Sequence, residues 1–109
     1  MAKNYKIIAQ ASPAATTDTT LYTVPSATQV AISSITICNR AATAATYRIA
    51  MRPNAEILAD KHYIAYDASV PANDTIALTL GLTADAADVI TVYASTASVS
   101  FGVFGSEIV

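Results

Sequence analysis

The chain has 109 residues, a formal net charge of −2 and only 13% charged residues, against about 25% in a typical globular domain. It is too short for a TIM barrel or a Rossmann enzyme with a second domain, and too rich in isoleucine, valine and leucine to be disordered, so one folded domain is expected. The isoelectric point near 5.0 argues against a nucleic-acid partner, which would require a basic surface.

Short runs of β-branched residues alternate with turn residues about every ten positions, a spacing typical of a β-sandwich or barrel. In the first part of the chain, strands are predicted over 6–11 and 19–24, with an ordered arm or loop over 12–18 between them. Pro25 ends the second strand, because proline has no N–H to donate to a sheet ladder.

The third predicted strand, 28–39, changes the parity of its apolar residues partway along. Val30 and Ile32 are at even positions and would point to one side of the strand. Ile35 and Ile37 are at odd positions and would point to the other side. Side chains alternate strictly along a regular strand, so all four can be buried only if the strand is irregular. We therefore predict a bulge or bend at Ser33 and Ser34.

The fourth predicted strand, 46–52, has an apolar face and an arginine face. The apolar face carries Tyr47, Ile49 and Met51. The opposite face carries Arg48 and Arg52. After this strand, 54–61 is the best helix candidate in the chain, with Asn54 as its cap, although it spans barely two turns.

The remaining predicted strands are 62–68, 75–80, 89–95 and 99–104. The last two are expected to form a terminal hairpin, and the acidic segment 83–88 is expected to be a loop. Alternation places Tyr63 and Tyr66 on opposite faces of their strand. The same alternation predicts that three apolar side chains of the strand 75–80 point inward: Ile76, Leu78 and Leu80. Gly81 permits a positive φ after them.

Together these elements predict an all-β chain. The expected fold is a single antiparallel β-sandwich, jelly-roll or immunoglobulin-like, of about eight strands. In this reading residues 1–18 form an N-terminal strand and arm, and residues 19–109 form the sandwich domain. Residues 1–6 are polar and no apolar run approaches the ~20 residues that span a bilayer, so neither a signal peptide nor a membrane partner is expected.

The inventory of catalytic residues is thin. His62 is the only histidine and Cys38 the only cysteine, so we expect His62 to be structural or solvated and Cys38 to be a small buried hydrophobe. The glycines match no phosphate-binding motif, and Gly102 and Gly105 are expected to mark a bulge and a turn. We expect no catalytic, cofactor-binding or metal-binding residue, no cofactor, and no enzymatic activity.

The acidic segment contains one weak candidate for a metal site. Asp85 and Asp88 are three residues apart, but a calcium ion needs roughly six to eight oxygen ligands. Roles in turn formation are therefore favoured for both aspartates, with calcium binding as an open alternative.

Three arginines close together are unusual in a chain with so few charges, and exposed tyrosines are enriched at protein interfaces. We therefore predict a partner interface among Arg40, Arg48, Arg52, Tyr63 and Tyr66. The alternative is an ordinary solvated face on which the arginines pair with nearby carboxylates.

Over roughly residues 19–109 the chain resembles small virion proteins of tailed phages, especially marine and cyanobacterial phages. The resemblance lies in the segments LYTVP (21–25), ICNRAATAATYRIA (37–50), DKHYIAYD (60–67), DVITVYAS (88–95) and FGSEI (104–108). It implies a structural role in the virus particle, and it identifies no binding residue.

The first functional hypothesis is a capsid decoration, or cement, protein that binds across major capsid subunits on the head surface after synthesis in the host cytoplasm. An alternative is a tail protein of the same virion, in the baseplate, fibre attachment or tip. A third hypothesis, from another class, is a carbohydrate-binding sandwich that presents tyrosines to a sugar. We expect a homo-oligomer, with a trimer favoured, because cyclic symmetry matches repeated sites on a virion.

Overall fold

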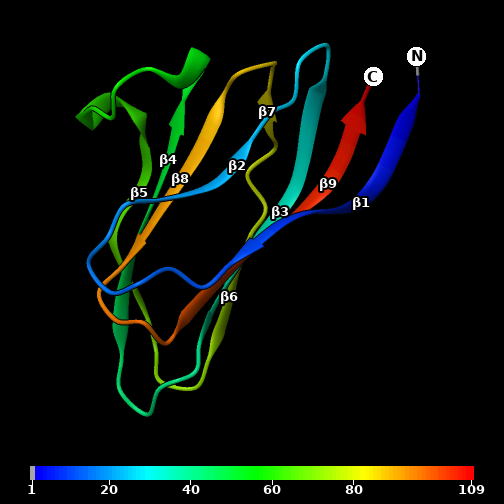
Figure 1. Ribbon diagram of the computed structural model, residues 1–109. Helices are drawn as coiled ribbons and strands as arrows, with labels where there is room; N and C mark the ends of the chain where they lie inside the picture. The colour runs from blue at the N-terminus through cyan, green and yellow to red at the C-terminus, as the bar shows by residue number, and fades with distance from the viewer. Residues whose placement is uncertain (1) are drawn as a thin grey trace.

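Two antiparallel β-sheets face each other across an apolar core (Figure 1). The structure is a computed structural model and describes residues 2–109. Sheet A contains, in spatial order, β1 (Lys3–Ala11), β9 (Val99–Ile108), β3 (Gln29–Asn39) and β6 (Thr75–Leu78), with β7 (Leu82–Ala84) also paired to β3. Sheet B contains β2 (Thr19–Thr23), β8 (Val89–Ala94), β4 (Ala45–Arg52) and β5 (Tyr63–Val70). The predicted all-β antiparallel sandwich is confirmed.

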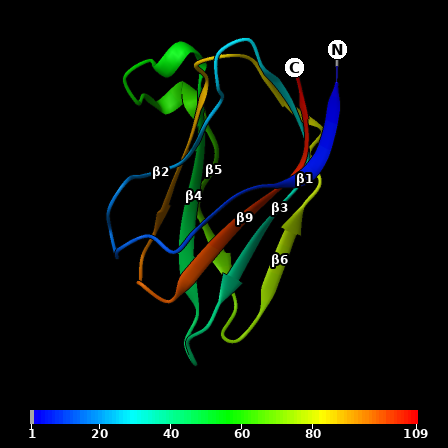
Figure 2. The same cartoon turned by 45° about the vertical axis from the view of Figure 1, so that its right-hand side comes forward.

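The strands pair in a nested order, from the two ends of the sequence toward its middle. β1 pairs with β9, β2 with β8, β3 with β6 and β7, and β4 with β5. Successive pairs alternate between sheet A and sheet B, which the second view shows as two separate layers (Figure 2). A long antiparallel ribbon rolled up in this way is a jelly roll. Of the two sandwich types that the sequence allowed, the topology is therefore the jelly roll.

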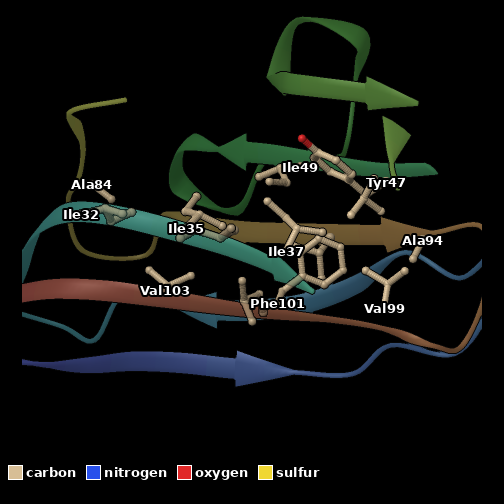
Figure 3. Close-up of a cluster of buried hydrophobic side chains, with 14 of the residues drawn as sticks. Ile32, Ile35, Ile37, Tyr47, Ile49, Ala84, Ala94, Val99, Phe101 and Val103 are labelled. Carbon is tan, nitrogen blue, oxygen red and sulfur yellow. The ribbon is translucent and has the colours of Figure 1, made fainter. Parts of the chain in front are cut away.

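The core lies between the two sheets and is formed by the residues at alternate strand positions, whose side chains point inward (Figure 3). Its fully buried members include Ile35, Ile37, Ile49, Val92, Val99 and Val103. The rings of Tyr47 and Phe101 meet edge to face with centroids 6.4 Å apart and thereby connect the sheets. Burial of large aliphatic side chains stabilises such a sandwich by about 2 kcal/mol for each residue.

The bulge predicted in the long third strand is confirmed. The register of β3 against β9 shifts between Ile32 and Ser34, and the hydroxyl of Ser33 donates a hydrogen bond to the carbonyl of Phe104 (3.0 Å). Val30 and Ile32 before this shift and Ile35 and Ile37 after it are all buried, each with at most 4% of its surface exposed. The extra residue restores the inward direction that strict alternation would have lost.

The predicted terminal hairpin is wrong, because β8 belongs to sheet B and β9 to sheet A. The connection between them crosses from one sheet to the other. At its start, Ser95 donates its N–H to Thr46 of β4. At its end, Ser98 accepts a hydrogen bond from the N–H of Arg40, directly after β3. Each end is thus bonded to a different sheet, and a sequence pattern cannot distinguish this crossing from a tight turn.

The helix candidate 54–61 is also wrong. Its place is taken by two short 3₁₀ turns, η1 (Pro53–Ala55) and η2 (Asp60–His62). Asn54 has a left-handed φ of 52°, which cannot continue a helix. Ile57 is 91% exposed, so the segment has no buried apolar face that would stabilise a helix.

Three smaller expectations are corrected. Strand β6 ends at Leu78, and Leu80 is half exposed instead of inward. The start of the acidic segment 83–88 is part of β7, because residues 82–84 pair antiparallel with residues 30–32 of β3. Cys38 is only partly buried, because Ile37 and Asn39 on either side take the inward positions. Gly81 does have the predicted positive φ, at 64°.

Buried Asn39 holds together three connections at one end of the sandwich. Its Nδ2 donates to the carbonyls of Thr43 (2.8 Å) and Pro71 (3.2 Å). Its Oδ1 accepts from the backbone N–H of Ala41 (3.0 Å) and lies 3.4 Å from the hydroxyl of Ser98. A side chain that is 1% exposed needs such partners, because an unpaired buried amide is costly. Within residues 2–109, no helix has the length and apolar character to cross a bilayer.

Candidate interaction site

A bulge in β5 aims two side chains at one arginine. The register of β5 against β4 leaves Tyr66 and Asp67 together opposite the single residue Arg48. Asp67 has a left-handed φ of 50°, a conformation that aspartate tolerates better than most residues. Bulges of this type redirect side chains, and here both residues are turned to the outer face of sheet B.

Arg48 is the centre of the resulting group of side chains. Its guanidinium carbon lies 4.2 Å from the ring centroids of both Tyr66 and Tyr93, within range of a cation–π contact. Its Nε donates to the carboxylate of Asp67 at 2.7 Å and its second hydrogen bond to that carboxylate is 3.3 Å long. This hydrogen bonding raises the pKa of Arg48 and lowers the pKa of Asp67. We call Arg48, Tyr63, Tyr66, Asp67 and Tyr93 the Arg48 cluster.

Tyr63 joins this cluster, contrary to the expectation that Tyr63 and Tyr66 lie on opposite faces. Their rings meet edge to face, with centroids 4.8 Å apart and planes at 85°. The reason is a second register shift in β5 around Ile64, which changes the parity between the two tyrosines. Burial raises the pKa of Tyr63, and the negative charge of Asp18 adds to this shift.

A shallow hollow lies beside the cluster and is lined by Asp60, Tyr63 and Tyr66. Asp60 comes from the η2 turn, immediately before β5, so the turn and the strand together form the hollow. Tyr66 is 56% exposed. The side chain therefore remains available for contact with another molecule, although one of its faces is near Arg48.

The structure unites three of the five predicted interface residues and separates the other two. Arg40 donates to the hydroxyl of Ser12 (2.9 Å) and to a backbone carbonyl in the β8–β9 connection. Arg52 donates to the carbonyl of Glu56 (3.2 Å). Tyr93 was missed by the sequence prediction. Its position between two buried residues of β8 was a usable signal, because alternation places it on the same outer face as Arg48.

The outer face of sheet A is different in kind. The outward positions of β3, β6, β7 and β9 alternate with core residues and carry no charged side chain in the described strands. We call this surface the neutral face. Its members are Tyr5, Ile7, Ala31, Thr36, Cys38, Thr75, Ala77, Thr83, Ser100, Phe104 and Ser106. Tyr5 and Ile7 on β1 are 81% and 56% exposed, and Lys3 lies at the rim.

The aspartates of the acidic segment and His62 have structural partners. Asp88 accepts hydrogen bonds from the N–H groups of Asn54 and Asp85, both at 2.8 Å, and Asp85 accepts one from Ala86. Buried His62 accepts the N–H of Ala59 on Nδ1, and its Nε2 lies 3.2 Å from Glu56. Among residues 2–109, no three histidine, cysteine or acidic side chains are grouped closely enough to hold a metal ion.

No protein-family model, curated protein or solved structure matches the chain significantly.

Proposed function

We propose that the protein is a structural component of a phage virion, bound to the head surface as a decoration protein across major capsid subunits. The observation that carries this proposal is the neutral face of sheet A. The phage resemblance of residues 19–109 supports it, and jelly rolls are common in virus particles, although a fold alone does not define a function.

An uncharged face of alanine, serine and threonine suits repeated docking onto a protein shell. Few charges must lose their hydration when the face is covered, so the cost of desolvation is small. Exposed Tyr5 and Ile7 at one side supply apolar area of the kind that contributes to binding. A protein that binds only the assembled shell stabilises it by mass action.

The test places a charge on the neutral face. Ala77 is exposed on β6 and Thr20 is exposed on β2 of the opposite sheet, so Ala77→Asp and Thr20→Asp are matched variants. Purified chain should co-sediment with emptied phage heads, and Ala77→Asp should weaken this binding about tenfold or more while Thr20→Asp leaves it unchanged. Equal binding by both variants would exclude the neutral face as the docking surface.

Localisation in the particle distinguishes the head from the tail. Electron cryo-microscopy should show the sandwich on capsid faces, and mass spectrometry of virions should give copies in the hundreds. Density confined to the baseplate, the fibre attachment or the tip would replace the decoration role with a tail role.

A further inference from the structure

The hollow beside the Arg48 cluster combines two aromatic rings with a carboxylate. The rings of Tyr63 and Tyr66 are nearly perpendicular, so they form two walls of a corner, and Asp60 lies at its edge. This corner is on sheet B, whereas the neutral face is on sheet A. Whatever binds it is therefore separate from a partner on the neutral face.

The charges around the corner do not cancel. Arg48 pairs with Asp67 at 2.7 Å, and Lys61 lies 3.5 Å from Glu56, so both nearby cations already have carboxylate partners. Asp60 forms no salt bridge with any of residues 2–109. Asp18 forms none there either, and its charge reaches Tyr63, whose pKa is raised first by burial and then by Asp18. Asp60 at the edge of the corner and Asp18, whose charge reaches Tyr63, are thus two carboxylates without a salt-bridge partner among residues 2–109, although Arg48 opposes the effect of Asp18 on Tyr63.

The cluster already holds one cation by the same chemistry. The guanidinium of Arg48 lies 4.2 Å from two tyrosine rings and is paired to a carboxylate. The corner repeats this combination of ring and carboxylate: Arg48 lies against one of its rings, Tyr66, whereas Asp60 has no salt-bridge partner among residues 2–109. We propose that the hollow of Asp60, Tyr63 and Tyr66 binds a lysine or arginine side chain of a second protein chain. The choice of a protein partner rests on the proposed function; the preference for a cation rests on the hollow alone.

The first test uses a small cation and its neutral analogue. Nα-acetyl-lysine methylamide and Nα-acetyl-norleucine methylamide differ by the ammonium group and are otherwise similar in shape. Titration of the whole chain, followed by NMR, should shift the ring resonances of Tyr63 and Tyr66 with the lysine compound only. Binding should be weak, with Kd on the order of 1 mM or above, and weaker still in high salt.

Variants then locate the binding. Asp60→Asn removes the charge with little change in shape and should weaken binding of the lysine compound about fivefold. Tyr66→Ala should weaken it by a similar factor or more. The controls are Asp85→Asn and Tyr5→Ala, which change an aspartate and a tyrosine away from the hollow and should leave the affinity unchanged.

Three results would overturn the inference: shifts of equal size with both compounds, no shift with either, or ring shifts produced by methyl glucoside and not by the lysine compound. The last result would assign the hollow to sugars. Co-sedimentation with emptied phage heads separates this inference from the proposed function. Lysine binding by a chain that fails to bind heads would refute the proposed function only, whereas head binding without lysine binding would refute the inference only.

Discussion

Gly105 shows at the scale of one residue why the interior of a strand can require glycine. It lies in β9 between Lys6 of β1 and Ile32 of β3. A Cβ at this position would lie 2.1 Å from the carbonyl oxygen of Ala31, which belongs to the backbone. At Gly102 the nearest atoms are 2.9 Å away and belong to the side chains of Phe104 and Thr36. Side chains can move aside more easily than a strand can.

We expect Gly105→Ala to destabilise the protein by about 3 kcal/mol, because two sheet backbones would have to separate. Gly102→Ala should cost only about 1 kcal/mol, because the Phe104 ring can rotate away. Urea denaturation of both variants measures the difference. Equal stabilities would show that β3 and β9 tolerate a wider spacing at Gly105 than the structure has.

Sequence reasoning succeeded at the residue scale where the signal was local. The apolar residues of β3 change parity within one strand, so the bulge at Ser33 could be predicted from that segment alone. The need for glycine at 105 comes from contact with a strand far away in the chain, and the prediction of a turn there was wrong. The grouping of Tyr63 with Tyr66 was missed because β5 shows no comparable break in its pattern.

At the scale of strands, Glu107 connects β9 to two others. Its carboxylate lies 2.6 Å from the Nζ of Lys6 on β1 and accepts a hydrogen bond from the hydroxyl of Tyr22 on β2. Lys6 and then Tyr22 hold the pKa of Glu107 below its ordinary value. Burial, together with this hydrogen bond, raises the pKa of Tyr22. Because β2 belongs to sheet B, Glu107 fastens the two sheets together near both ends of the described chain.

This connection should depend on pH. The pKa of Glu107 in the folded protein is below its ordinary value of 4.5. The stabilisation is therefore complete above about pH 4.5 and is lost as pH falls through the folded-state pKa. Glu107→Gln should lower the urea midpoint near pH 7, and the gap to the wild type should narrow as the pH falls below 4.5. A gap of constant size would show that the charge of Glu107 contributes nothing.

Strand pairing was the part of the fold that sequence could not supply. Strands β8 and β9 are adjacent in sequence and both alternate well, which is equally consistent with a hairpin and with a crossing between sheets. The hydrogen bonds from Ser95 to β4 and from Arg40 to Ser98 belong to the crossing between the sheets. These partners are distant in the chain, so local propensity carries no information about them.

At the scale of the whole molecule, the few charges are unevenly placed. The outer face of sheet B carries Arg48, Arg52 and Asp67, whereas the neutral face of sheet A has only Lys3 at its rim. Small uncharged residues such as Thr75 and Ala77 alternate with apolar residues along the strands of sheet A. That they collect on one sheet follows from the jelly-roll order, which places β1, β9, β3 and β6 side by side.

We expect the isolated protein to form a homo-oligomer, most readily a trimer, because cyclic symmetry matches repeated sites on a virion. Light scattering coupled to size-exclusion chromatography should give three times the chain mass of 11.3 kDa. A single species at the chain mass, even at high concentration, would contradict self-association in solution.

The nested pairing of strands also determines when the protein can fold. β9 is the inner partner of both β1 and β3, so sheet A lacks its middle strand until residues 99–108 have left the ribosome. β1 is synthesised long before β9 and remains without this partner until β9 has been made. Folding is therefore expected to be slow for a domain of this size, since its pairings are mostly between distant residues. During this interval β1, with Tyr5 and Ile7, is exposed to aggregation.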